Sequence, residues 1–173
     1  AVALMLISPE LVLIFGSPKY REAVYVIPPV AASVFFIFIY NILSMPQFYY
    51  EKTQFLMAAS MAAAGANVVL NFIFIRLFGY IAAGYTTLAC YMLYSVGHYI
   101  VSKRILVNEG IQENLMNPGF LVACSVFLIG ASIICNLIFP YRILRYAILL
   151  ASAGLVFWKK ELLLKTMADI RKK

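Results

Sequence analysis

Charged residues are scarce in this sequence. Only 12% of its 173 residues are charged, whereas soluble domains carry about 25%. Acidic residues are particularly few, with seven Asp and Glu against 14 Lys and Arg. The scarcity of charge, together with 64% hydrophobic residues and a mean hydropathy of +0.91, excludes an ordinary water-soluble domain. We therefore expect an integral membrane protein.

Metal-binding residues are also few and scattered. His98 is the only histidine, and Cys90, Cys124 and Cys135 lie in apolar segments without the spacing of a metal site. We interpret the cysteines as small packing residues and expect no metal. His98 lies one helical turn before Lys103, so we favour an interfacial histidine over a proton relay.

The signatures of catalysis are missing as well. The sequence has no Gly-rich phosphate loop, no clustered carboxylates and no Ser/His/Asp set at one depth. We therefore expect no enzyme, no catalytic residue and no cofactor. A pI near 9.4 could indicate a nucleic-acid partner, but the basic residues lie in loops and near the C-terminus. Membrane lipid is the simpler partner for them, and we expect no nucleic acid.

Long apolar runs dominate what is present. A helix of about 20 apolar residues crosses the hydrocarbon core of a bilayer. We expect spans near residues 1–15, 23–45, 54–77, 81–101, 120–139 and 143–158, followed by a basic tail, 159–173. The predicted fold class is all-α: a polytopic transmembrane bundle of about six helices. Because the chain opens inside an apolar run, we interpret it as the C-terminal part of a longer protein with a truncated first helix.

Prolines and small residues shape these spans. The first run is expected to break or to be capped near Pro9, and Pro28 and Pro29 lie in the first turns of the second. The third run is small on nearly every face between Ala58 and Ala66, which indicates a helix buried among others. Arg142 and Arg145 are expected to snorkel at one end of the last span, with Trp158 anchoring the other.

Glu10 is the only acidic residue inside an apolar run. Either it caps the short helix after Pro9 near the interface, or it is a carboxylate that couples transport to a cation or pairs with substrate. Both interpretations stay open at the level of sequence.

Amides and hydroxyls supply the polar positions of the central spans. Asn67 and Asn71 are one turn apart on one face, and they serve either as hydrogen bonds between helices or as the lining of a substrate path. Asn41 near the end of the second span is a further candidate. The fourth span is rich in hydroxyls, and its spacing predicts one hydroxyl-bearing face. The members of this face are Thr87, Tyr91, Tyr94 and Ser95. Tyr85, Thr87 and Tyr91 are further candidates for the substrate path.

Close packing and orientation follow from simpler signals. Ala82, Ala83 and Gly84 predict that the fourth span lies close to a neighbour. Five basic residues fall on one side of the membrane and nine on the other, which puts the nine and the C-terminus in the cytoplasm. The five are Lys19, Arg21, Arg76, Arg142 and Arg145, and the nine are Lys52, Lys103, Arg104, Lys159, Lys160, Lys165, Arg171, Lys172 and Lys173.

Two stretches carry a family resemblance. One joins Asn67 and Asn71 to the sequence FGYIAAGYTTL at 78–88 and to Gly97-His98-Tyr99; the other runs from Ile27 to Thr53. They resemble the oligosaccharide repeat-unit flippases of bacterial O-antigen and capsular polysaccharide export, in the MATE-like (MOP) exporter superfamily. Such flippases often have Glu where this chain has Gln47.

The resemblance implies a protein of about twelve helices in two six-helix lobes, of which this chain is the second. A polyprenyl-diphosphate-linked oligosaccharide would cross the bacterial inner membrane as the lobes rock in alternating access. Asn67, Asn71 and the tyrosines would bind sugar, and Arg76 is a candidate for the diphosphate. Two other classes stay open: a cation-coupled antiporter of drugs or small solutes, which would need Glu10, and a scaffold that transports nothing.

Overall fold

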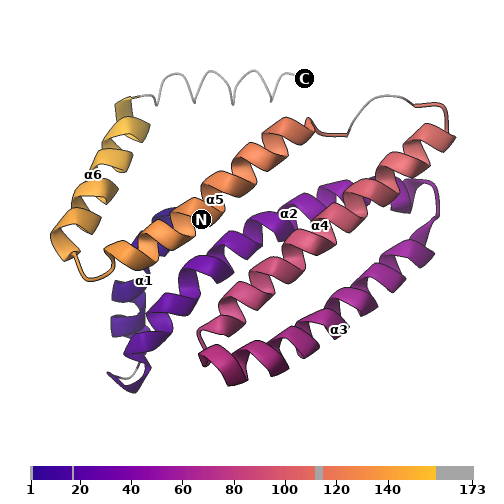
Figure 1. Cartoon of the computed structure of the whole chain (residues 1–173). Helices are drawn as coiled ribbons and strands as arrows, with labels where there is room; N and C mark the ends of the chain where they lie inside the picture. Colours follow the sequence, from indigo (N-terminus) through magenta and orange to yellow (C-terminus); the bar gives the residue numbers. More distant parts are fainter. Residues whose placement is uncertain (1, 17, 112–114, 159–173) are drawn as a thin grey trace. The chain divides into compact units, whose positions relative to one another are not determined.

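The computed structural model describes residues 2–16, 18–111 and 115–158, without the side chains of 18–21, 152–153 and 155–158. Over these ranges the chain is helical and has no strand (Figure 1), so the all-α prediction is confirmed there. The basic tail 159–173 and the side chain of Trp158 lie outside the described residues. The elements are α1 (Val2–Phe15), the 3-10 helix η1 (Pro18–Val26), α2 (Ile27–Tyr49), α3 (Thr53–Phe78), α4 (Ala82–Asn108), α5 (Pro118–Ile138) and α6 (Arg142–Trp158).

Prolines interrupt these helices less than the sequence suggests. α1 continues through Pro9 to Phe15 instead of breaking there. α2 continues past Pro46 and ends at Tyr49. A proline this close to the C-terminus of a helix removes only its own N–H donor. Later amides still bond, and Tyr50 N donates to the Pro46 carbonyl. Pro28 lies in the first turn of α2, where its missing donor costs nothing.

Three described helical segments are long and apolar enough to cross a membrane. They are Glu22–Tyr49, Thr53–Phe78 and Pro118–Ile138. α4 is as long as these but carries many hydroxyls, and it is not in this set. α4 is therefore the long helix whose polar groups most need hydrogen-bond partners on neighbouring helices.

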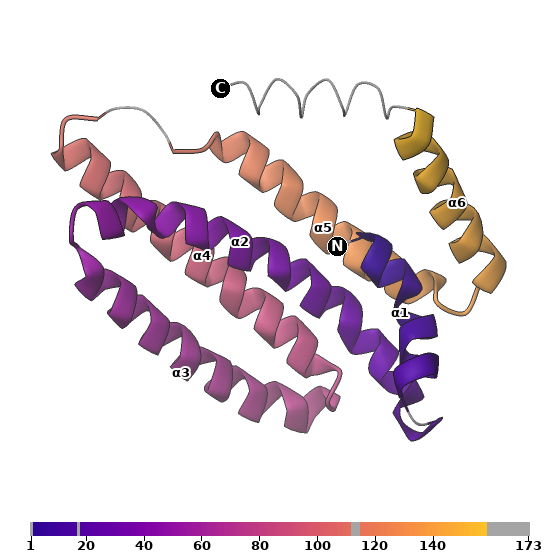
Figure 2. The ribbon, with the colours of Figure 1, turned by 180° about the vertical axis from the view of Figure 1, so that it is seen from behind.

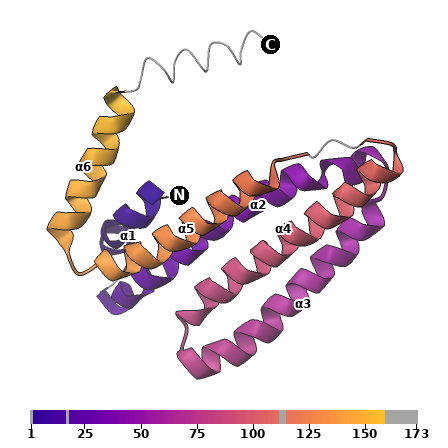
Figure 3. The ribbon, with the colours of Figure 1, turned by 45° about the horizontal axis from the view of Figure 1, so that its top comes forward.

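Residues 1–136 form one compact unit. Within it α2, α4 and α3 lie side by side, with α4 between the other two (Figures 1 and 2). Short turns join α2 to α3 and α3 to α4, so consecutive helices run antiparallel, as the view in Figure 3 also shows. The most extensive packing is between α2 and α4, where Phe36, Ile39, Leu43 and Leu88 are buried.

α3 is far more open than predicted. None of its residues is buried, although its small residues predicted a helix enclosed by neighbours. The prediction was wrong for the described residues because α3 contacts α4 along one side and has no second helix of comparable extent against it. Its small side chains therefore leave most of its surface exposed.

Two glycines set the backbone geometry at the start of α4. Gly79 ends α3 with a φ of 76°, a conformation that side chains rarely adopt, and its N–H bonds to the Ile75 carbonyl. Gly84 packs so closely that a Cβ there would lie 2.9 Å from Pro29 Cγ and 3.0 Å from the Val26 carbonyl oxygen. The prediction of close packing around residues 82–84 is confirmed at Gly84.

The second unit begins at Leu137 and contains α6. Arg142 is exposed at the start of this helix. Arg145 is 1% exposed, and its guanidinium carbon lies 5.5 Å from the centroid of the Tyr146 ring. The expectation that both arginines snorkel was therefore wrong for Arg145, whose charged end is enclosed by protein.

Candidate functional site

α4 carries polar side chains toward both of its neighbours. Ser95, His98 and Ser102 follow one another at three- and four-residue intervals and face α2, where Ser95 Oγ donates to the Phe36 carbonyl. Thr86 and Tyr94, eight residues apart, bond instead to side chains of α3. Eight residues are slightly more than two turns, so Thr86 and Tyr94 lie near one side of α4. That side faces α3, whereas the first series faces α2. The single hydroxyl face that the sequence predicted is thus divided between two helix interfaces.

The first polar group is the glutamine–histidine cluster, formed by Gln47, His98 and Ser102. Gln47 Nε2 lies 2.8 Å from His98 Nδ1 and 2.9 Å from Ser102 Oγ. Ser102 Oγ in turn donates to the Leu43 carbonyl. Gln47 and His98 are each only 1% exposed and Ser102 is fully buried. Three polar side chains therefore meet in the interior of the α2–α4 pair.

Hydrogen-bond directions follow from this geometry. Ser102 uses its proton toward Leu43, so its oxygen accepts from Gln47, which identifies the nearer Gln47 atom as the amide nitrogen. His98 Nδ1 then accepts the second amide proton, and the imidazole proton lies on Nε2. Among the described residues, His98 Nε2 and Gln47 Oε1 have no hydrogen-bond partner although both are buried. The cluster thus offers one spare donor and one spare acceptor.

Aromatic rings enclose this cluster. The Tyr94 ring lies edge-on to His98 with centroids 4.4 Å apart, and Tyr40 of α2 lies 4.6 Å from Tyr94. Tyr40 also stacks on Tyr91, at 6.3 Å and 7°. Tyr94 extends the group to α3, where its hydroxyl lies 2.6 Å from Ser60 Oγ. The rings form apolar walls that end in hydroxyls.

The second polar group is the asparagine–threonine cluster of Asn67, Asn71 and Thr86. Asn71 Nδ2 donates to Asn67 Oδ1 at 2.9 Å, and Thr86 Oγ1 donates to Asn71 Oδ1. The pair on α3 is therefore joined to α4 by a single hydroxyl. Both asparagines are half-buried, so each remains partly accessible.

The other predicted site residues do not join these clusters through hydrogen bonds. Asn41 is exposed and donates back to the Ile37 carbonyl of its own helix at 2.7 Å. Tyr85 accepts from Asn136 Nδ2 of α5 at 2.7 Å. Arg76 lies with its guanidinium carbon 3.9 Å from the Phe72 centroid, exposed at the end of α3. Glu10 is half-buried in α1.

Sequence reasoning found some of the site and missed its most buried part. Tyr91 was a candidate and does contact Tyr40, whereas Thr87 makes no side-chain hydrogen bond with the described residues. His98 was interpreted as an interfacial residue, and Gln47 was noted only for the Glu that the flippases often have there, yet both are buried between α2 and α4. One feature of the sequence did indicate the buried cluster. His98 and Ser102 are four residues apart, which puts both on the same face of the helix as Ser95.

A further polar contact lies at the turn between α3 and α4. The Tyr80 hydroxyl donates to Glu22 Oε2 at 3.1 Å. Desolvation raises the pKa of Tyr80 above its usual value, and the hydrogen bond to Glu22 and the charge of that carboxylate raise it further. Tyr80 therefore stays neutral and ties the turn to η1.

No protein-family model, no curated protein and no solved structure matches this chain. The described residues hold no group of three or more His, Cys, Asp or Glu that could bind a metal. Both clusters consist of side chains that exchange neutral hydrogen bonds.

Proposed function

We propose that this protein is a membrane transporter that flips polyprenyl-diphosphate-linked oligosaccharide repeat units across the bacterial inner membrane. The two uncharged polar clusters between apolar helices carry this proposal. Three of the described helical segments are apolar enough to span a bilayer, and polar groups inside such helices are costly unless they have partners or a role. Gln47 Oε1 and His98 Nε2 are buried and lack partners among the described residues.

Sugar recognition requires this kind of chemistry. Each hydroxyl of a sugar donates one hydrogen bond and accepts others, and amides, hydroxyls and neutral imidazole can match both. The half-buried Asn67 and Asn71 could exchange their mutual bond for bonds to substrate at little cost, since neutral hydrogen bonds are worth only about 0.5–1.5 kcal/mol net. Arg76, exposed and without an ion pair among the described residues, is available to a diphosphate.

The proposed mechanism is the alternating access that the resemblance to oligosaccharide flippases implies. The chain would form one six-helix lobe that rocks against a second lobe, with the substrate between them and with the C-terminus in the cytoplasm. In this scheme the faces of α3 and α4 that bear the asparagine–threonine cluster line the path. The broad exposure of α3 supports such a role, because a helix that lines a cavity keeps one side free of packing.

The decisive experiment deletes the gene and measures surface polysaccharide together with lipid-linked repeat units in the membrane. We expect surface polymer to be lost and the lipid-linked intermediate to accumulate. Normal surface polymer in the deletion strain would refute the flippase. Loss of resistance to a cationic drug with unchanged polymer would instead favour the cation-coupled antiporter.

A second experiment tests whether Asn67 and Asn71 line the substrate path. The double variant Asn67→Ala with Asn71→Ala should reduce export at normal protein levels. Gln54→Ala is the control, because Gln54 is exposed near the start of the same helix, makes no side-chain hydrogen bond with the described residues and should leave export unchanged. Full export by the double variant would show that the pair only joins helices.

A further inference from the structure

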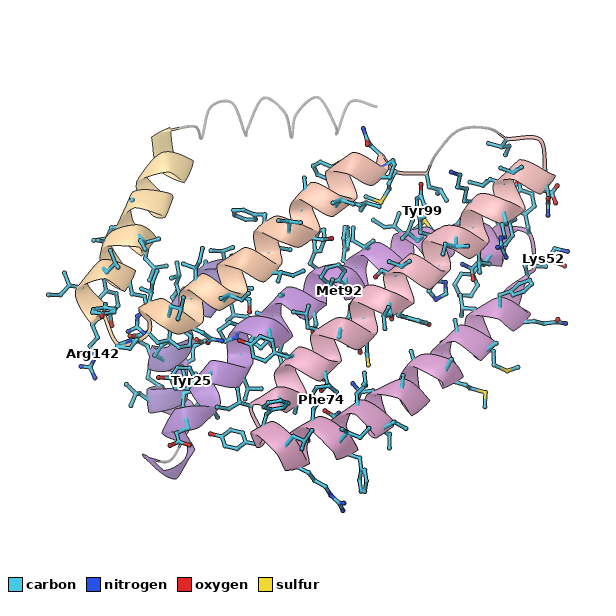
Figure 4. All side chains as sticks on the ribbon, in the orientation of Figure 1. Tyr25, Lys52, Phe74, Met92, Tyr99 and Arg142 are labelled. Atoms are coloured by element: carbon cyan, nitrogen blue, oxygen red, sulfur yellow. The ribbon has the colours of Figure 1, made fainter. Side chains whose placement is uncertain are left out.

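An apolar groove crosses the surface of the first unit, on the side of α4 that carries Met92 and Tyr99 (Figure 4). α2, α4 and α5 form it, and its volume is about 400 Å³. The lining is almost entirely aliphatic or aromatic, including Phe35 and Leu43 of α2 and Val126 of α5. Such a groove accepts a flexible hydrocarbon better than a polar molecule.

The groove holds two serine hydroxyls, which are already used, and the phenol of Tyr99 at its boundary with the polar surface. Ser95 Oγ donates within the α2–α4 pair, to the Phe36 or the Tyr91 carbonyl, and Ser125 Oγ donates to the Leu121 carbonyl of its own helix. The groove thus has almost no hydrogen-bonding capacity to offer an occupant. An occupant with many polar groups would lose its hydration there without compensation.

A basic pocket adjoins the groove at Tyr99, which lines both. Its other residues include Lys103, Arg104 and Asn108 of the last turns of α4. Both cations are exposed, and neither forms an ion pair with the described residues. Tyr99 at the boundary is the residue type that marks the transition from hydrocarbon to headgroup in membranes. Hydrocarbon chemistry and positive charge therefore meet at one residue.

We propose that this groove and pocket bind one anionic phospholipid of the surrounding membrane. The acyl chain lies in the groove against Leu43 and Val126, and the phosphate lies between Lys103 and Arg104. Two cations and one amide can all donate hydrogen bonds to the oxygens of a phosphodiester, whose single negative charge they more than neutralise. Basic residues at a membrane surface attract anionic lipid. The inference requires the membrane location but not the flippase activity, so it can fail or hold independently of the proposed cargo.

The test uses the purified full chain, delipidated in detergent and returned to nanodiscs that contain equal amounts of phosphatidylglycerol and phosphatidylcholine. Native mass spectrometry then counts the lipids that remain bound. We expect one phosphatidylglycerol to be retained in preference to phosphatidylcholine. The double variant Lys103→Gln with Arg104→Gln should lower that preference about thirtyfold, from the contribution of two basic residues at a membrane surface.

Single variants test the basic pocket and the apolar groove separately. Lys52→Gln removes an exposed cation outside the pocket and should change nothing. Val126→Trp fills the groove from an exposed position and should weaken retention of both lipids. Circular dichroism must show unchanged helix content for each variant. A phosphatidylglycerol with a photoreactive group at its chain end gives a readout without substitution: it should label residues 118–129 and not α3.

Several results would overturn the proposal. Equal retention of the two lipids would remove the role of charge. Displacement by inorganic phosphate at the same concentration as the lipid would indicate a headgroup site without a chain. Tighter binding of a polyprenyl phosphate than of phosphatidylglycerol would assign the groove to the tail of the transported substrate instead. Even labelling of α3 and α5 would indicate ordinary contact with bulk lipid.

Discussion

Gln47 donates both amide hydrogens to side chains of another helix, which makes it the most connected buried polar residue between α2 and α4. Gln47→Leu keeps much of the volume and removes both donations. His98 Nδ1 and Ser102 Oγ then lose their donor in a buried place, and we expect a loss of about 1–3 kcal/mol in the free energy of unfolding. Denaturant unfolding in detergent micelles, followed by circular dichroism, measures it.

Gln54→Leu is the control for that experiment. Gln54 is exposed near the start of α3 and makes no side-chain hydrogen bond with the described residues, so its replacement should stay within about 0.5 kcal/mol of the wild type. Equal losses for the two variants would show that the effect comes from added apolar surface and not from the glutamine–histidine cluster.

Thr86 and Thr87 are neighbours in sequence with different partners. Thr86 Oγ1 donates to Asn71 of α3, whereas Thr87 makes no side-chain hydrogen bond with the described residues. Thr86→Val should therefore cost about 1 kcal/mol and speed hydrogen exchange in the adjoining turns of α3, while Thr87→Val should do neither. Exchange measured peptide by peptide by mass spectrometry distinguishes them, and the same effect from both would exclude a specific bond.

The sequence reveals local polar pairs better than distant ones. Asn67 and Asn71 are predicted as neighbours because helical periodicity alone puts them one turn apart, and they do bond to each other. Gln47 and His98 are 51 positions apart. Their contact depends on how α2 and α4 dock, and no periodicity carries that information. A glutamine beside aromatic residues therefore resembles an interface anchor until its partner helix is in place.

Helices approach each other closely only where a residue permits it. Gly84 lies against the ring of Pro29 and the backbone of Val26, neither of which can rotate away. Gly84→Ala should force η1 and α4 apart and cost about 1–3 kcal/mol by overpacking. Thermal unfolding in detergent should show a lower midpoint for this variant.

Gly97 also lies in α4, but at a position where a side chain has room. A Cβ at this position meets nothing within 4 Å. Gly97→Ala should raise stability by about 0.5–1 kcal/mol, since alanine loses less backbone entropy in a helix than glycine does. Destabilisation by Gly97→Ala would show that its open side is occupied in the membrane, for example by another lobe or another chain.

Helix boundaries follow the sequence closely where the chain turns on glycine and less closely elsewhere. The start of α4 after Gly79 fits the prediction because glycine alone adopts that backbone conformation readily. Its end does not. The expected span stops near residue 101, yet α4 continues to Asn108 through Lys103 and Arg104. Charged residues end an apolar run but are good helix formers, so they do not end the helix.

In the first unit as a whole, the antiparallel order gives α2, α3 and α4 two common ends. The α2–α3 turn, with Lys52, lies at the same end as Lys103 and Arg104, whereas Tyr80 and Glu22 lie at the other. Basic residues favour the cytoplasmic side. Among the described residues of α3 and α4 and their turns, Lys52, Lys103 and Arg104 lie at the first end and Arg76 at the second. Lys52 should therefore face the cytoplasm and Tyr80 the outside.

Cysteine labelling in intact cells checks this orientation. Tyr80→Cys should react with a maleimide that cannot cross membranes, while Lys52→Cys should react only after the cells are permeabilised. The wild type provides the background, because Cys90 and Cys135 are buried and Cys124 is half-buried. The reverse pattern would invert the chain and move Lys103 and Arg104 to the outer leaflet, where the anionic lipid that we propose for them would have to be sought. Labelling of both positions in intact cells would mean that the α2–α3–α4 group does not cross the membrane, and a transport function would then be excluded.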